Sequence, residues 1–275
     1  MRLLDYIKGL KVPLYFTSIG TVLLGWALTG FQAKAIVILI LLVVVSMQAA
    51  LNTSMDYFDN LNGRKLRNDD TLFPLGSFFV EKLRVNPRHL LIAFIVLTII
   101  AVSLGLIVVF ITRNLWLLVL GLTAVFLSLL YVLPPVRLGS RGVGEIATFF
   151  SFGPFPLLGT IIALGKEVTF QTVLISITMG LLASSIRFLH HSPEDKIGGF
   201  RQTNFLAIYV SFTFIGLAAA LFVRGLLIPS LVSIFVALVQ VYYLPSDNLR
   251  ASRRTNGAVT IQLLFTLLAL LFIYI

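Results

Sequence analysis

The residues of this chain best suited to chemistry form two groups of carboxylates, each following a long apolar segment. The first group lies in Asn52-Thr-Ser-Met-Asp56-Tyr-Phe-Asp59, where Asn52, Asp56 and Asp59 stand at i, i+4 and i+7. A helix that continues through this stretch places all three on one face within two turns. Two carboxylates this close repel each other unless a cation lies between them, and Mg²⁺ prefers hard oxygen ligands. We therefore predict that Asp56 and Asp59 bind Mg²⁺. The alternative is that they are solvated acids at a helix end, balanced by nearby basic residues: Arg64, Lys65 and Arg67.

The second group of carboxylates is mixed with basic residues. Glu194 and Asp195 can supply further oxygen ligands to a metal ion, and Lys196 and Arg201 follow them closely. The lysine ammonium and the forked arginine guanidinium both neutralise phosphate oxygens. This stretch therefore predicts a second set of ligands for a metal ion and an anionic substrate.

Two adjacent histidines precede that group. His190 and His191 lie four residues before Glu194 and Asp195, a spacing that on a helix also suits a transition metal. Pro193 interrupts a helix across that spacing, and neighbouring histidines do not share a helix face. A histidine-containing metal site is therefore the minor alternative.

A third polar stretch ends an apolar segment with a double proline. It reads Tyr131-Val-Leu-Pro-Pro-Val-Arg137 and continues through Arg141 to a glycine-rich turn. Proline stops a helix and glycine lets the backbone turn tightly beside a ligand. We expect Arg137 and Arg141 to lie near the Tyr131 hydroxyl at the membrane edge. The alternative is an ordinary basic turn with no ligand.

The elements that must position these residues are nine apolar segments. Each is close to the length of about 20 residues that a helix needs to cross a hydrocarbon core. Hydrophobic residues make up 58% of the chain and the mean hydropathy is +1.00, a composition with which a soluble domain would aggregate. We predict an integral, multi-pass membrane protein with these spans: 13–31, 35–55, 89–112, 115–133, 146–164, 169–190, 205–223, 226–244 and 257–275.

Charge distribution orients these spans. Nine crossings place 17 of the 21 Lys and Arg on the side of the N-terminus and four on the other. The positive-inside rule therefore predicts a cytoplasmic N-terminus and an extracytoplasmic Ile275. Ten of the 11 acids also fall on the cytoplasmic side, where we expect the active site. The net charge of +10 is spread over short loops, which favours an anionic substrate and anionic lipid over nucleic acid. With no cysteine, the chain has no thiolate ligand or nucleophile.

Several motifs resemble those of one family. The pattern that starts at Tyr131, Tyr-x-x-Pro-Pro-x-Arg-Leu, is followed by Gly-x-Gly-Glu145 and by Phe152-Gly-Pro. It resembles the fourth-helix loop of the UbiA superfamily of intramembrane prenyltransferases, most closely the 1,4-dihydroxy-2-naphthoate prenyltransferases of the menaquinone branch. The opening Lys11-Val-Pro, followed by Gly20-Thr-Val-Leu-Leu-Gly, is similar to the start of that branch.

The resemblance covers essentially the whole chain and implies a fold. That fold is an all-α bundle of nine transmembrane helices, with cytoplasmic loops after helices 2 and 6 capping a central cavity. It forms a single domain over 1–275, with two pseudo-repeated halves at about 1–140 and 141–275.

The resemblance also implies an activity and roles for individual residues. The activity is Mg²⁺-dependent transfer of an isoprenyl group from a prenyl diphosphate to a small aromatic quinone precursor within the membrane. By that resemblance the catalytic residues would be Asp56, Asp59 and Asp195, and Tyr131 and Arg137 would lie on the side of the diphosphate. Together with the residue chemistry above, this predicts the metal ligands Asp56, Asp59, Glu194 and Asp195. The predicted residues that bind substrate are Asn52, Lys65, Tyr131, Arg137, Arg141, Lys196, Arg201 and His191.

Three positions depart from the motifs of that family. Met55 stands where the family has Asn, Lys65 where a third aspartate is expected, and His191 where the second motif begins with aspartate. Asp69 and Asp70 follow Lys65 closely and are candidate substitutes. An alternative function is therefore binding of a prenyl diphosphate with a non-quinone acceptor or without transfer. A secondary transporter is disfavoured because no charged residue lies near the centre of a span. Acceptor, prenyl chain length and oligomeric state stay open.

Overall fold

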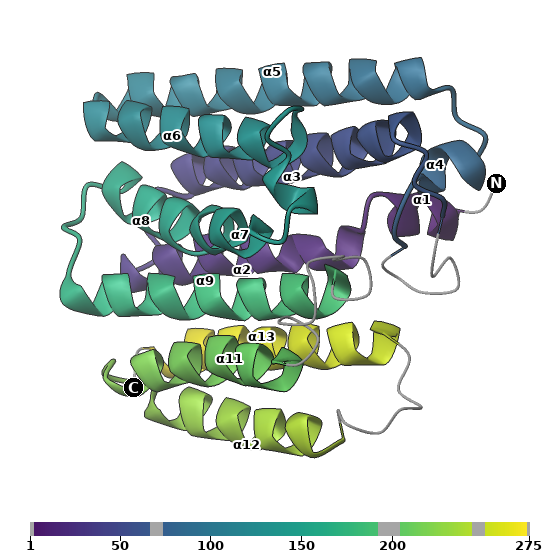
Figure 1. Cartoon of the computed structure of the whole chain (residues 1–275). Coiled ribbons are helices and arrows are strands. Elements are labelled where there is room, and N and C mark those ends of the chain that lie inside the picture. Colours follow the sequence, from purple (N-terminus) through teal and green to yellow (C-terminus); the bar gives the residue numbers. More distant parts are fainter. Residues whose placement is uncertain (1–2, 67–73, 192–203, 244–250, 274–275) are drawn as a thin grey trace.

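The computed structural model describes residues 3–66, 74–191, 204–243 and 251–273. Within these ranges the chain forms helices and no strand, and the long helices lie side by side in one bundle (Figure 1). The principal helices are α2 (Tyr15–Leu28), α3 (Lys34–Leu61), α5 (Pro87–Thr112), α6 (Leu115–Val132), α7 (Gly144–Phe152), α8 (Pro154–Ala163), α9 (Phe170–His191), α11 (Phe205–Leu221), α12 (Leu227–Tyr243) and α13 (Ala251–Phe272). The short ones are α1 (Leu3–Gly9), η1 (Val12–Leu14), α4 (Phe78–Glu81) and η2 (Leu138–Ser140).

Most of these helices are suited to a membrane by length and composition. Among the described residues six are long and apolar enough to cross one, or seven if the bent pair Leu3–Gly9 and Val12–Leu28 forms a single span. Two shorter apolar helices, Leu206–Leu221 and Leu227–Tyr242, follow. These findings confirm an all-α integral membrane protein. The nine crossings remain a prediction.

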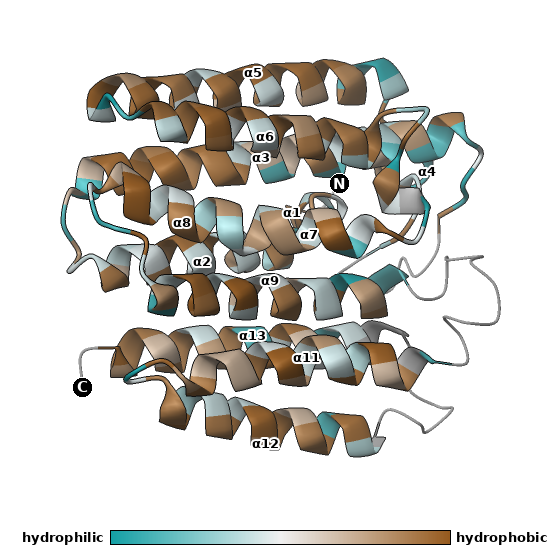
Figure 2. Ribbon diagram, turned by 60° about the vertical axis from the view of Figure 1, so that its left-hand side comes forward, coloured by the Kyte–Doolittle hydropathy of each residue, from teal (hydrophilic) through white to brown (hydrophobic). Residues whose placement is uncertain are grey.

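Hydrophobic residues predominate along the long helices (Figure 2), and many of them are exposed. On α5 and α6, Phe110 is 83% exposed, Trp116 73% and Phe126 63%. Such a surface is costly in water and is expected where lipid chains cover the protein, because the helix backbones satisfy their own hydrogen bonds.

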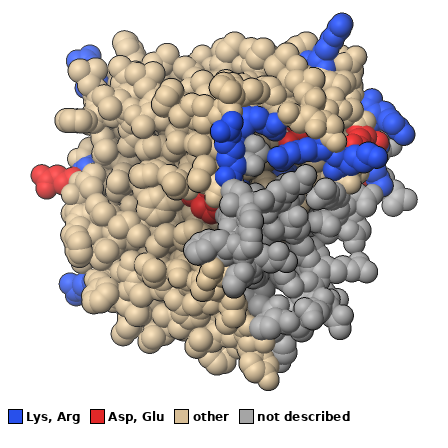
Figure 3. All heavy atoms as spheres, in the orientation of Figure 1, with Lys and Arg blue, Asp and Glu red and all other residues tan. Residues whose placement is uncertain are grey.

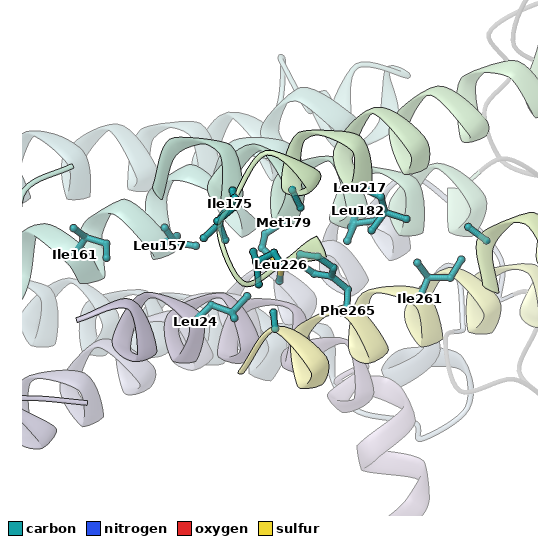
Figure 4. Packing of buried hydrophobic residues seen from close by; sticks show 14 residues of the cluster. Leu24, Leu157, Ile161, Ile175, Met179, Leu182, Leu217, Leu226, Ile261 and Phe265 are labelled. Carbon is teal, nitrogen blue, oxygen red and sulfur yellow. The ribbon is translucent and has the colours of Figure 1, made fainter. Parts of the chain in front are cut away.

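The core lies where α9 packs against α2, α8, α11 and α13. Leu24, Leu157, Ile175, Met179 and Phe265 are fully buried there and interdigitate (Figure 4). Because this packing is tight, it holds α9 rigidly across the bundle, and the end of α9 is where His190 and His191 lie.

The predicted span 146–164 is broken into two helices, α7 and α8. Pro154 begins α8 and has no amide hydrogen with which to continue α7. Gly153 packs so closely on α9 that a methyl group there would overlap the backbone of Ser176 and Gly180. The break leaves the Phe152 carbonyl to accept a hydrogen bond from the Thr21 hydroxyl at 2.8 Å. The broken helix thus presents polar groups in the middle of the bundle.

Charged side chains gather at one end of the molecule, near α1 and α4 (Figure 3). The same end holds the last turns of α3 and α9 (Figure 1). The C-terminal end of α13 lies at the opposite end of the bundle from α1 (Figure 1).

Candidate active site

The two predicted carboxylates lie on the last turns of α3, which continues to Leu61. Asp56 and Asp59 are 5% and 7% exposed. The backbone N–H of Phe79, in α4, donates to Asp56 Oδ2 at 3.0 Å, whereas Asp56 Oδ1 has no hydrogen-bond partner among the described residues. A buried carboxylate oxygen without a partner is costly. Asp56 therefore offers a place for a cation.

Asp59 joins α3 to the loop that follows α6. The guanidinium Nη2 of Arg137 lies 3.1 Å from Asp59 Oδ1, and Arg64 Nη1 lies 3.6 Å from the same oxygen. Arg137 also stands over the Phe58 ring, 5.8 Å from its centroid. This ion pair brings together two stretches that lie 78 residues apart in the sequence. Both stretches were predicted to belong to the site.

A small charged cavity lies beside this ion pair. Its volume is about 20 Å³, room for about one water molecule or ion. Among the described residues it has more basic than acidic groups, since Asp59 is joined by Lys11, Arg64, Arg137 and His191. We call it the charged cavity. Its composition suits an anion that carries more than one negative charge.

A second cavity of about 100 Å³ adjoins the first. The two cavities have four lining residues in common: Lys11, Met55, Tyr131 and His191. The remaining wall combines apolar side chains with neutral polar ones, among them Gln48, Asn52, Ser128, Thr148 and Ser151. We call it the polar cavity. Such a wall can hydrogen-bond the hydroxyl or carboxyl groups of a small aromatic molecule.

A third, apolar cavity of about 290 Å³ extends into the bundle between α3, α5, α6 and α8. It shares Gln48, Leu51, Ser128, Ser151 and Phe152 with the polar cavity. Gly105 and Gly121 line it from α5 and α6. The three cavities therefore form a series that runs from charged through polar to apolar.

The other predicted site residues are placed differently. Asn52 lines the polar cavity and donates through Nδ2 to the Leu10 carbonyl at 2.6 Å, which holds the turn between α1 and η1. Lys65 is exposed, and Arg141 donates to the Pro135 carbonyl at 2.6 Å; neither lines the three cavities. Their substrate-binding role stays a prediction. Several further predicted residues lie outside the described ranges: Asp69, Asp70, Glu194, Asp195, Lys196 and Arg201.

Three residues in or beside the cavities had no predicted role. Lys11 lines both the charged and the polar cavity. Arg187, also a lining residue of the polar cavity, forms a buried ion pair of 2.6 Å with Glu145. A basic residue near the end of an apolar segment indicates a buried ion pair, because a buried charge needs a partner of opposite charge. The sequence does not show which acidic residue is that partner.

The described residues fit a Mg²⁺ ion that is completed by other groups. They contain no cluster of three or more His, Cys, Asp or Glu placed to hold a metal. Asp56 and Asp59 supply two carboxylates, one with a free buried oxygen. Mg²⁺ is commonly held by one or two carboxylates together with substrate phosphates and water. Further ligands would come from substrate phosphates and water, while the predicted ligands Glu194 and Asp195 lie outside the described residues.

Fold and site together define a membrane protein with a charged site that opens, through a polar cavity, into an apolar one. Over 205 residues the chain is 25% identical to 2-carboxy-1,4-naphthoquinone phytyltransferase of Synechocystis sp., a match that covers 72% of this chain and 64% of the relative. Over 167 residues it is 27% identical to the 1,4-dihydroxy-2-naphthoate octaprenyltransferases of Mycobacterium leprae and Mycobacterium tuberculosis, covering 61% of this chain and 54% of each relative.

These curated relatives are naphthoate prenyltransferases, so the resemblance predicted from the motifs is confirmed. The chain spans less than two thirds of the length of each of them. No protein-family model matches the chain, and no solved structure matches it.

Proposed function

We propose that this protein transfers an isoprenyl group from a prenyl diphosphate to an aromatic, naphthoate-like acceptor within the membrane, with Mg²⁺ as cofactor. The single observation that carries the proposal is the series of adjoining cavities, because its order matches the chemistry of one substrate. A prenyl diphosphate has a charged head, a reactive carbon and a long apolar tail, and the cavities are charged, polar and apolar in the same order. The naphthoate prenyltransferase relatives support the same activity.

The charged cavity is the proposed site for the diphosphate head, which would extend into the polar cavity because the charged one is small. Arg64, Arg137 and Lys11 line it and can neutralise phosphate oxygens. Held by Asp56 and Asp59, Mg²⁺ would supply further positive charge that stabilises the diphosphate as it leaves. Tyr131 lines both the charged and the polar cavity and would donate a hydrogen bond to the leaving oxygen.

The acceptor would occupy the polar cavity and the tail the apolar one. When the C1–O bond breaks, its electron pair stays with the diphosphate, and an electron-rich ring carbon of the acceptor then bonds to C1. That carbon loses its proton to the released diphosphate, and the electron pair of the C–H bond restores the aromatic ring. Water would capture the allylic cation, so the reaction requires a shielded site. Ala147, Ala183 and Ile186 are buried in the wall of the polar cavity, and their apolar side chains would disfavour water beside the cation.

The direct test is product formation by the purified protein from labelled prenyl diphosphates and a panel of acceptors. We expect product with 1,4-dihydroxy-2-naphthoate and loss of product when EDTA removes Mg²⁺. Product with another phenolic or a phosphorylated acceptor would change the proposed acceptor and leave the proposed prenyl transfer standing. Binding of the diphosphate without product for any acceptor would favour the alternative function of a prenyl diphosphate binding protein.

We also propose nine membrane crossings, with the active site facing the cytoplasm. The N-terminus would be cytoplasmic and Ile275 extracytoplasmic, since 17 of 21 basic residues then lie inside. A phosphatase reporter fused after Ile275 is expected to be active, and a fluorescent reporter that matures only in the cytoplasm is expected to stay dark there. The reverse pattern would defeat this topology, because either the number of crossings would be even or the orientation would be opposite.

A further inference from the structure

Arg187 lines the polar cavity and makes three side-chain hydrogen bonds to other parts of the protein. It lies on α9 and is 5% exposed. Its Nη1 contacts Glu145 Oε1 at 2.6 Å, its Nη2 donates to the Gly139 carbonyl at 2.7 Å, and its Nε donates to the Tyr131 hydroxyl at 3.1 Å. The three nitrogens of one guanidinium thus bind three separate elements, α7, η2 and α6.

This arrangement fixes Arg187 in place. The hydroxyl of Ser184 donates to the Glu145 carbonyl at 3.0 Å, so the first turn of α7 is attached to α9 twice. A methyl group at Gly144 would overlap the guanidinium, which shows how closely α7 covers it. With its charge balanced by a buried carboxylate and each nitrogen donating to protein, Arg187 is poorly placed to bind a phosphate.

The position of Arg187 determines the hydrogen bonding of Tyr131. Its phenol oxygen accepts the Nε–H of Arg187, and the guanidinium also lies 5.6 Å from the centroid of its ring. A hydroxyl that accepts one hydrogen bond still has its own proton to donate. Tyr131 lines both the charged and the polar cavity, so that proton is available at the boundary where the C1–O bond of a prenyl diphosphate would break.

We propose that Arg187, clamped by Glu145, is a positioning residue that holds Tyr131 as a hydrogen-bond donor to the departing diphosphate oxygen. This inference rests on the proposed function. As C1–O breaks, the electron pair and the growing negative charge go to that oxygen, and the hydrogen bond from Tyr131 strengthens. An interaction that is stronger in the transition state than in the ground state raises kcat and leaves substrate binding little changed.

A double-mutant cycle on the purified protein tests this. Tyr131→Phe removes only the donor and is expected to lower kcat about 100-fold, the cost of losing one such donor. Arg187→Lys keeps a cation beside Glu145 but loses the Nε–H and the planar fork, and is expected to lower kcat at least about tenfold. If Arg187 acts through Tyr131, the double variant is no slower than Tyr131→Phe alone. Effects that multiply would overturn the inference.

A second readout separates a positioning role from a structural one. Farnesyl thiodiphosphate, an analogue that ionises very slowly, is expected to bind Arg187→Lys and wild type with the same Kd within about twofold, because the ground state is unaffected. A large loss of binding by the variant would instead mean that Arg187 shapes the binding site itself. Glu145→Gln, which keeps the shape and removes the balancing charge, is the second variant. It should show the same lack of additivity with Tyr131→Phe, so the test stands even if Arg187→Lys does not fold.

The outcome also distinguishes this inference from the proposed function. Wild-type protein that neither binds the analogue nor forms product would defeat the proposed function. Wild-type protein that forms product, with multiplicative effects in the cycle, would defeat the role of Arg187 alone.

Discussion

Asp56→Asn is expected to lower both turnover and Mg²⁺ affinity at least about tenfold while leaving the protein folded. The asparagine keeps the shape of the side chain and can still accept the hydrogen bond from the Phe79 N–H. What it loses is the negative charge on the oxygen that has no partner among the described residues. Even changes outside the direct ligands of a metal cost 10–100-fold in affinity or activity, so loss of a ligand should cost no less. Initial rates across a Mg²⁺ titration measure both quantities.

Asp59→Asn provides the comparison, because Asp59 contacts Arg137 and Arg64 as well as facing the charged cavity. If Asp59 also binds Mg²⁺, its variant loses Mg²⁺ affinity as Asp56→Asn does. If Asp59 only anchors Arg137, the variant raises the KM for the prenyl diphosphate and keeps its Mg²⁺ dependence. Glu167→Gln, an exposed carboxylate after α8, is the matched control and should behave as wild type. Wild-type Mg²⁺ dependence in both Asp56→Asn and Asp59→Asn would refute the metal site.

The carboxylates of α3 were predictable because they depend on a single helix. A spacing of three or four residues fixes the face on which Asp56 and Asp59 lie, and the apolar segment before them indicates the helix. The loop with Arg137 was predicted to join the site because its order of residues resembles the family motif on the side of the diphosphate. The contact with Asp59 agrees with that prediction.

The partners of Arg187 and Asn52 were not predictable in the same way. The contact between Arg187 and Glu145 joins residues 42 apart, and that between Asn52 and the Leu10 carbonyl also joins residues 42 apart. Such pairs depend on how helices pack, and no local periodicity encodes them. Asn52 does share the face of Asp56, but its amide is used to hold the turn before η1. It therefore lines the polar cavity and not the charged one.

The break at Gly153 shows a different limit of sequence reasoning. The predicted span 146–164 contains Gly153 and Pro154. A proline in an apolar helix can either kink it or divide it into two helices, and the sequence does not distinguish these outcomes. Close packing of Gly153 on α9 accompanies the break here. The result bears on function, because Ser151 and Phe152, just before the break, line both the polar and the apolar cavity.

Gly121→Phe is expected to shorten the prenyl chain that the protein accepts. Gly121 lines the apolar cavity from α6, and a β-carbon added there meets nothing within 4 Å. A phenylalanine can therefore enter the cavity without moving the backbone, and it takes up space that a long tail would need. Forcing extra atoms into a filled site costs about 1–3 kcal/mol, or roughly 10–100-fold in an equilibrium constant. We expect kcat/KM for octaprenyl diphosphate to fall by that factor and the value for geranyl diphosphate to stay within about twofold.

Val119→Phe is the matched control, since Val119 lies on the same helix, is 55% exposed and does not line the apolar cavity. It adds a ring to the lipid-facing surface and should leave the preference for chain length unchanged. Competition between the two diphosphates in one reaction measures this preference directly and does not depend on the amount of active protein. An equal fall in kcat/KM for both diphosphates in Gly121→Phe would show that Gly121 is needed for the fold and does not contact the prenyl tail. An unchanged preference would place the tail outside this cavity, most simply along the lipid-facing side of α5 and α6.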